Sequence, residues 1–130
     1  MAVTFKNIVV GREYSRPDLA DIWGYKGYQA IARGVVTPRD SNIIILFVTE
    51  VKQDFQEQYQ DQLDGKILKW EGPTDHFAEK RMINANKSTD QIHVFHRIRH
   101  HTDFRYLGLV HVESYKLFSN KPSRFILNAK

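Results

Sequence analysis

A run of six consecutive apolar residues, Ile43 to Val48, places the strongest constraint on the fold. The run is mostly β-branched, and it is too short to span a bilayer. A continuous apolar pattern is typical of a strand that is covered on both faces, whereas a half-exposed strand alternates. A buried helix has the same composition, and only the short length of the run separates the two. We expect this segment to be the central strand of a sheet.

Two later segments alternate between apolar and polar residues. Residues 92–98 and 104–112 carry this period of two on either side of a polar loop at 100–103, so they predict a β-hairpin. Weaker signals of the same kind, together with turn residues such as Asp64-Gly65, predict further short strands at 32–36, 66–70, 114–118 and 124–127.

Two short helices are expected. Ser15 can cap a helix that continues through Pro17 and is closed by Gly24, with Leu19, Ile22 and Trp23 on one face. A second helix is expected over 75–83, where Thr74 is the candidate N-cap, with an exit loop at 84–89. About six strands and two short helices predict an α+β fold built on a small, curved mixed sheet or an open β-barrel.

Length and composition narrow the class of protein. The chain has 130 residues and no cysteine, which predicts one domain over 1–130 and excludes disulfides, thiolate metal sites and thiol nucleophiles. The apolar stretch near the N-terminus is shorter than a signal-peptide core. We therefore expect a cytoplasmic protein that does not associate with membranes.

Charge is distributed unevenly along the chain. Residues 50–64 carry one lysine and five acidic residues, whereas residues 65–130 carry twelve basic and six acidic residues. A concentration of positive charge in one half of a chain is typical of proteins that bind anionic polymers. The C-terminal half is therefore the expected contact surface for nucleic acid.

Metal and nuclease sites have little support. The acidic segment 50–64 lacks the ligand order of a calcium loop, and no HExxH motif occurs among the six histidines, although His93 and His111 could meet across the predicted hairpin. Asp75 and Glu79, one turn apart on the expected helix, could hold a cation for phosphodiester cleavage, but they equally suit an exposed helix face. We assign no metal ligand, cofactor site or catalytic residue.

Basic and aromatic residues favour nucleic acid more strongly. Lysine and arginine side chains contact phosphates, and flat aromatic rings stack on bases. The basic candidates fall in one stretch: Lys80, Arg81, Lys87, Arg97, Arg99 and Arg105. Most of the aromatic residues are expected in the core, but Tyr59 and Trp70 lie in polar sequence and are the better candidates for contact with a base.

The order of several short motifs resembles a known family. The segments GREYSRPDLADIWG, ARGVVTP, IIILFVTE, QYQD, LKWEGP, IHVFHR and FRYLG, within about residues 8–110, resemble the SRA-like domains fused to McrA-type HNH restriction endonucleases. They are also similar to the C-terminal domain of some bacterial restriction-type helicases. This resemblance implies a PUA-like barrel that binds duplex DNA and takes a flipped, modified base into a pocket, leaving cleavage to an attached nuclease domain. That nuclease is missing from this chain.

The resemblance marks particular positions in this sequence: Tyr14, Arg16, Asp18, Tyr59, Asp61, Trp70, Gly72, Arg97, Tyr106 and Gly108. Tyr59 and Trp70 could stack on a base, and Asp61 could accept a hydrogen bond from an exocyclic amine. The predicted phosphate contacts are Arg81, Arg97, Arg99 and Arg105, and Arg16 is a further residue expected to bind nucleic acid. The motif Glu71-Gly72-Pro73 and the pair His100-His101 match no pocket that the resemblance implies.

The sequence therefore predicts a DNA-binding module that recognises a modified base, by base flipping, in a restriction or phage-defence context. It is expected to be a reader rather than an enzyme, with double-stranded DNA as its partner and a separate nuclease or helicase for cleavage. Three alternatives remain open. They are a metal-dependent nuclease, an RNA-binding PUA-like module, and a protein-interaction domain whose acidic loop 50–64 docks a basic partner.

Overall fold

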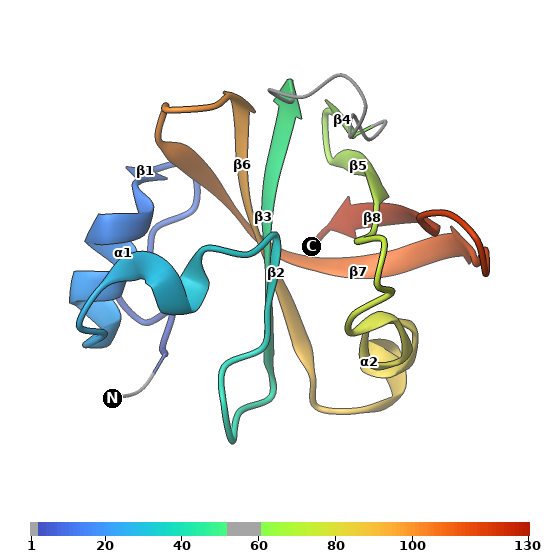
Figure 1. Ribbon diagram of the computed structural model, residues 1–130, viewed down its shortest axis with the longest axis horizontal. Helices are drawn as coiled ribbons and strands as arrows, with labels where there is room; N and C mark the ends of the chain where they lie inside the picture. The colour runs from blue at the N-terminus through green and yellow to red at the C-terminus, as the bar shows by residue number, and fades with distance from the viewer. Residues whose placement is uncertain (1–2, 52–60) are drawn as a thin grey trace.

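The computed structural model of the chain describes residues 3–51 and 61–130. These residues form one mixed, open sheet of eight strands with two α-helices beside it (Figure 1). The elements in chain order are β1 (Glu13–Tyr14), α1 (Arg16–Trp23), a 3₁₀ helix (Tyr28–Ile31), β2 (Val35–Val36), β3 (Ile43–Val51), β4 (Gln62–Asp64), β5 (Ile67–Glu71), α2 (Glu79–Asn84), a 3₁₀ helix (Ala85–Lys87), β6 (Gln91–Arg99), β7 (Phe104–Lys116) and β8 (Arg124–Ala129).

The strands follow the order β2-β3-β6-β7-β8-β5-β4, and β1 pairs with β7 off this path. Strands β3 and β6 are parallel, and the other pairs are antiparallel. In the described residues β2 and β4 are the ends of this path, so the sheet curves without closing. The α+β fold class predicted from the sequence, with a curved mixed sheet and two short helices, is confirmed.

Strand β3 confirms the prediction of a strand covered on both faces, although it lies next to the end strand β2 and not at the centre of the sheet. Its side chains alternate between two hydrophobic cores. Ile44 and Leu46 pack into the core that includes Trp70 and Phe125, whereas Ile45 and Phe47 pack into a core beneath α1. Because both faces of β3 are buried, the residues that point to either face are apolar, which explains the unbroken apolar run.

Helix α1 also follows its sequence signals. The Ser15 hydroxyl accepts a hydrogen bond from the Asp18 backbone N–H at 3.1 Å, and the Asp18 carboxylate accepts one from the Ser15 N–H at 3.1 Å. This reciprocal capping satisfies two donors that a helix start otherwise leaves unpaired. Gly24 ends the helix with φ +78°, a left-handed conformation that favours glycine. Ile22 departs from the prediction, because 46% of it is exposed.

The start of the second helix was predicted wrongly. Helix α2 begins only at Glu79, after Ala78 in a left-handed conformation with φ +66°, and Thr74 caps nothing in it. The preceding residues form a turn instead, because the Asp75 carboxylate accepts the Phe77 N–H at 3.1 Å and His76 has φ +59°. The expected exit loop begins as a short 3₁₀ helix, Ala85–Lys87. No helix in the described part of the chain is long and apolar enough to cross a membrane.

The predicted hairpin is confirmed as β6 and β7. Strand β7 continues to Lys116, so it includes most of the strand that was expected separately at 114–118. The suggested meeting of His93 and His111 is wrong, because His93 lies opposite Leu109 while His111 lies opposite Asn128 on β8. The strand expected at 32–36 is reduced to the two residues of β2.

Candidate nucleic-acid interface

A pocket of about 210 Å³ lies where the curved sheet fails to close. Strand β2, at one end of the sheet, and strand β5, near the other end, both contribute to its wall. The lining residues are Arg33, Gly34, Val35, Phe47, Asp61, Trp70, Glu71 and Pro73. We call this hollow the edge pocket. It combines apolar surface with two carboxylates and one guanidinium.

Asp61 is a buried acidic residue of the edge pocket. It directly precedes β4, and only 9% of it is exposed. One carboxylate oxygen, Oδ1, accepts the Glu71 backbone N–H at 2.8 Å, which ties the start of β4 to the end of β5. A buried carboxylate is costly unless it is hydrogen-bonded, so this contact fixes both the position and the orientation of the side chain.

Trp70 belongs mainly to the core, and one part of it lines the edge pocket. It lies opposite Phe125 in the β5–β8 pair, and the two ring centroids are 5.5 Å apart at 45°. Only 5% of the residue is exposed. The indole therefore supplies a rigid apolar wall rather than a freely accessible stacking face.

At the edge pocket, an ion pair connects the segment before β2 to the segment between β5 and α2. The Arg33 guanidinium contacts the Asp75 carboxylate at 3.0 Å, and 58% of each side chain is exposed. The guanidinium also lies 4.7 Å from the centre of the Phe77 ring. Exposed pairs of this kind contribute about 0–1 kcal/mol. Arg33 can therefore exchange its carboxylate partner for another anion at little cost.

Arg16, predicted to bind nucleic acid, lies mostly inside the fold. Its Nε donates to the Ile31 carbonyl at 2.9 Å, and its guanidinium lies 4.6 Å from the Phe47 ring and 5.0 Å from the Phe104 ring. Burial, with a smaller contribution from nearby Arg97, lowers the pKa of Arg16 to about 10. Its contact with nucleic acid stays a prediction, and the observed role is to hold α1 against the sheet.

Arg97 has a similar internal role at the β6–β7 turn. Its Nε donates to the Thr49 hydroxyl at 2.8 Å, and Nη1 donates to the Thr102 carbonyl at 3.1 Å. The guanidinium stacks 4.2 Å from the centre of the Phe104 ring. Burial lowers the pKa of Arg97. These contacts connect the turn to β3, and part of the side chain still lines a second hollow.

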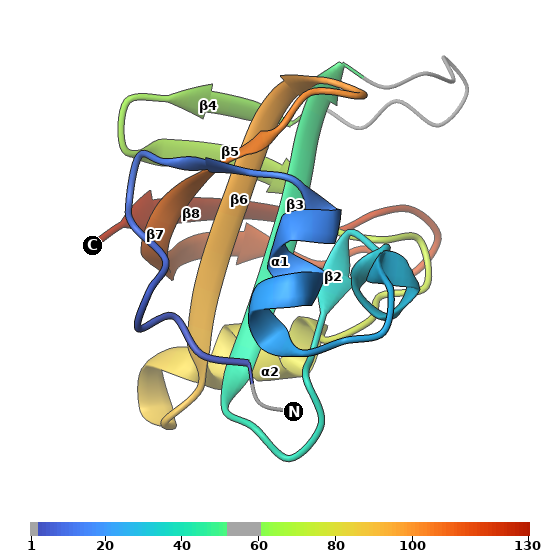
Figure 2. The same ribbon diagram turned by 90° about the vertical axis from the view of Figure 1, so that its left-hand side faces the viewer.

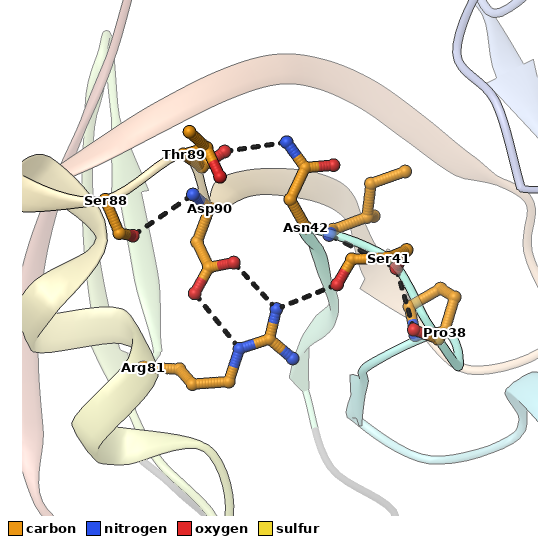
Figure 3. A network of polar contacts seen from close by, with 8 residues as sticks. Pro38, Ser41, Asn42, Arg81, Ser88, Thr89 and Asp90 are labelled. Atoms are coloured by element: carbon orange, nitrogen blue, oxygen red, sulfur yellow. Dashed lines mark hydrogen bonds and ion pairs between the residues drawn. The ribbon is translucent and has the colours of Figure 1, made fainter.

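Arg81 forms a two-pronged ion pair with Asp90 (Figure 3). Nε and Nη2 donate to the two carboxylate oxygens at 3.1 and 2.9 Å, and Nη2 also reaches the Ser41 carbonyl at 3.4 Å. The hydrogen bond to Asp90 raises the pKa of Arg81. The side chain joins α2 to the segments that lead into β3 and β6. Contact with phosphate stays a prediction for this residue.

A second hollow, of about 790 Å³, lies between the β6–β7 hairpin and the β4–β5 turn. Arg97, Arg99 and Arg105 all line it, so the structure brings these three predicted residues together. Arg99 and Arg105 are exposed, and Arg105 lies 3.5 Å from the Glu13 carboxylate. Their arrangement suits contact with an extended anion, and the phosphate role itself remains a prediction.

His96 forms part of the floor of this second hollow. It is 7% exposed, and its Nε2 lies 3.5 Å from the Glu50 carboxylate without a hydrogen-bonding partner among the described residues. Burial lowers the pKa of His96, and the negative charge of Glu50 opposes this effect only in part. The imidazole is therefore neutral at pH 7.

The sequence predictions and the observed sites overlap in part. Asp61 and Trp70 meet at the edge pocket, whereas Tyr59 lies outside the described residues. Sequence reasoning missed Arg33 and Phe47. It also treated Glu71-Gly72-Pro73 as a motif without a place in a pocket, although Glu71 and Pro73 line this one. Arg33 lies in the motif ARGVVTP, and Glu71 and Pro73 lie in LKWEGP. Only the approach of the two ends of the sheet in the folded chain shows that these residues line one pocket.

The geometry required for the nuclease alternative is not observed. Asp75 precedes α2 and is engaged by Arg33, so it does not share a helix face with Glu79. Glu79 instead lies 2.6 Å from His76 Nδ1. Within residues 3–51 and 61–130, no group of three or more His, Cys, Asp or Glu side chains could hold a metal ion.

Comparison with solved structures defines the class of fold. The chain is similar to the SUVH5 SRA domain in a crystal structure with hemi-methylated CG DNA, with a TM-score of 0.65, 18% identity, and coverage of 98% of this chain and 92% of that chain. The SUVH5 SRA domain bound to fully hydroxymethylated CG DNA is similar at a TM-score of 0.61 and 20% identity, covering 98% and 92%. The fold is therefore SRA-like.

The family can also be stated. A family model described as a domain of unknown function, DUF3427, matches residues 8–125, so the chain belongs to the DUF3427 family. A comparison with curated proteins finds no match.

Proposed function

We propose that this chain binds duplex DNA and recognises a modified base that is flipped into the edge pocket. The observation that carries the proposal is the place of this pocket: it occupies the opening of an SRA-like sheet and contains a fixed carboxylate beside apolar walls. Enzymes and readers that inspect single bases need a recess of this kind, because the base must leave the stack before its edge can be read.

Each part of the edge pocket has a chemical role in this proposal. Phe47 and the accessible part of Trp70 contact the flat apolar surface of the base. Asp61, held by the Glu71 N–H, accepts a hydrogen bond from an exocyclic amine. A carboxylate at this place favours bases that carry such an amine, which are cytosine, adenine and guanine, over thymine.

Arg33 and the second hollow supply the expected electrostatic contacts. Arg33 is exposed at the edge pocket, and its present partner Asp75 is weakly bound because the pair is in water. Arg99 and Arg105 lie exposed on the β6–β7 hairpin. Contacts to phosphate position a protein on the duplex and make its affinity sensitive to salt.

The resemblance seen in the sequence also supports a proposal about the biological context. The resemblance to domains of McrA-type restriction endonucleases and restriction-type helicases supports a role in restriction or phage defence. In that role residues 1–130 act as one reading module, and a partner nuclease or helicase performs the cleavage or unwinding. The known structures of SUVH5 SRA domains with methylated and hydroxymethylated DNA support a reader of modified cytosine as the general class.

The test is a binding comparison with matched duplexes. The duplexes differ only in one base, which is cytosine, methylcytosine, hydroxymethylcytosine, glucosylated cytosine or methyladenine, and each is measured at two salt concentrations. We expect one modified duplex to bind at least about tenfold more tightly than its unmodified match, and this ratio to persist at higher salt because the pocket contact is not an ion exchange. Equal binding to all duplexes would contradict the proposal, and a preference for structured RNA would favour the RNA-binding alternative.

A further inference from the structure

The hairpin that joins β7 to β8 has an unusual charge pattern. Residues 115–124 contain three basic residues and no acidic residue. We call the side chains of Lys116, Lys121 and Arg124 the basic tip. All three residues are exposed. Among the ion pairs of the described residues, none involves any of them.

The two lysines of the basic tip surround one aromatic ring. The Lys121 and Lys116 ammonium groups lie 4.3 and 5.5 Å from the centre of the Phe118 ring. This arrangement keeps the two ammonium groups close to one ring, because a ring face attracts cations. Leu117 and Tyr115 beside them are 50% and 49% exposed. The tip therefore presents cations together with apolar surface.

Hydrogen bonds hold the hairpin against the wall of the edge pocket. The Gly72 N–H donates to the Ser123 carbonyl at 2.9 Å. Glu71, which lines the pocket, lies opposite Arg124 in the antiparallel pair of β5 and β8. The Phe118 N–H donates to the Ser123 hydroxyl at 3.2 Å, and Ser123 is fully buried. The basic tip is therefore fixed relative to the edge pocket.

The two overall views place the hairpin on the same side as the pocket loops. In Figure 2 the β7–β8 connection and the segment between β5 and α2 project together to the right, where β2 also lies. The turn between β4 and β5 and the C-terminus lie on the opposite side. Figure 1 shows the hairpin beside the same β5–α2 segment.

We propose that the basic tip binds the sugar–phosphate backbone of the duplex next to the base held in the edge pocket. Lys116 and Lys121 contact phosphates, and Leu117 packs against sugars. The inference rests on the proposed function, because that function identifies duplex DNA as the ligand. It adds a second contact surface that fixes the register of the duplex over the pocket without reading sequence.

The charge pattern favours a nucleic-acid backbone over a protein partner. The core of a protein–protein interface is depleted of charged residues and is more apolar than its rim. Here three cations flank a small apolar group, and the segment 115–124 that carries them contains no acidic residue, although Glu71 lies opposite Arg124 on β5. Evenly spaced phosphates match this pattern, because each exposed cation can replace one condensed counterion.

The test compares two double variants of the whole chain. K116Q/K121Q removes two charges from the tip, and K66Q/K130Q removes two exposed charges from the opposite side. Binding of modified and unmodified duplexes is measured against salt concentration, and thermal unfolding checks that both variants are folded. We expect the slope of log affinity against log salt to become shallower by about 2 units for K116Q/K121Q alone. Its affinity should fall by about tenfold for both duplexes, so that their ratio is unchanged.

The possible results separate the inference from the proposed function. If the parent chain prefers one modified duplex but K116Q/K121Q behaves like K66Q/K130Q, the role of the basic tip is wrong and the pocket proposal stands. If K116Q/K121Q loses the preference rather than the overall affinity, the tip reads the base and the inference is also wrong. If the parent chain binds no DNA, the proposed function fails, and the inference fails with it.

Discussion

Asp61→Asn should largely abolish the preference for the modified duplex, because the modified base is expected to occupy the edge pocket more than its unmodified match does. Asparagine retains an oxygen that can accept the Glu71 N–H, so the start of β4 stays in place. It puts an NH₂ group where the second carboxylate oxygen lies, and this donor faces the amine of the base instead of accepting from it. A hydrogen bond to a charged group contributes about 1.5–3 kcal/mol, so affinity for the preferred duplex should fall by about 10- to 100-fold.

A matched control separates this effect from a change in net charge. Asp64→Asn makes the same chemical change on β4, at an exposed residue that does not line the edge pocket. Competition binding with modified and unmodified duplexes measures both variants. We expect Asp64→Asn to keep the ratio of the two affinities. If the two substitutions change the ratio of the two affinities equally, Asp61 does not recognise the base.

The fold should lose stability in mild acid because His93 is buried as a neutral ring. Its Nδ1 lies 2.8 Å from the Tyr106 hydroxyl, its Nε2 lies 3.1 Å from the Gln91 side-chain oxygen, and Phe5 stacks on it. Since the Gln91 oxygen can only accept, Nε2 carries the proton and Nδ1 accepts from Tyr106. Burial lowers the pKa of His93 from its ordinary value of 6.5 to about 4.

The sign of the pH effect follows from this shift. Between pH 6.5 and 4 the unfolded chain binds a proton at His93 and the folded chain does not, so the free energy of unfolding falls as pH falls. The full loss from this residue is about 3 kcal/mol. His96, whose pKa is also lowered, adds to it in the same direction. Asp90 has a lowered carboxyl pKa and therefore contributes at lower pH.

Urea unfolding at several pH values between 7 and 4 measures this effect. His93→Gln removes the titrating group, so its free energy of unfolding should vary less with pH than that of the parent chain, whatever the stability of the variant at pH 7. His111→Gln is the control, because His111 is more exposed and lies on β7, whereas His93 lies on β6. An unchanged pH dependence in His93→Gln would show that another group causes the acid sensitivity.

Sequence signals predicted the elements that depend on local contacts. The unbroken apolar run of β3, the capping residues of α1 and the alternation of β6 and β7 each reflect forces within a few residues or on one strand face. The prediction of where α2 starts was wrong for a physical reason. The threonine signal at 74 competed with the Asp75 side chain, which folds the next residues into a turn before the helix can begin.

The site was harder to predict, because it depends on contacts between distant segments. Composition showed that arginines are abundant, but it could not show that Arg81 pairs with Asp90 or that Arg16 and Arg97 stack on phenylalanine rings. The edge pocket exists only because β2 and β5 approach each other at the opening of the sheet. Arg33 therefore gave no local sign of a role, since the sequence predicted only that it belongs to the short strand at 32–36.

The two tryptophans provide the most direct measurement of the central claim, that a base enters the edge pocket. Trp70 lines this pocket, whereas Trp23, the last residue of α1, is buried in the core with its Nε1 donating to the Thr4 carbonyl at 2.9 Å. Their indole N–H signals can be followed by NMR while the preferred modified duplex is added. We predict a large shift for Trp70 and almost none for Trp23, with a smaller Trp70 shift for the unmodified duplex. A Trp70 signal that stays in place while the duplex binds would contradict the account.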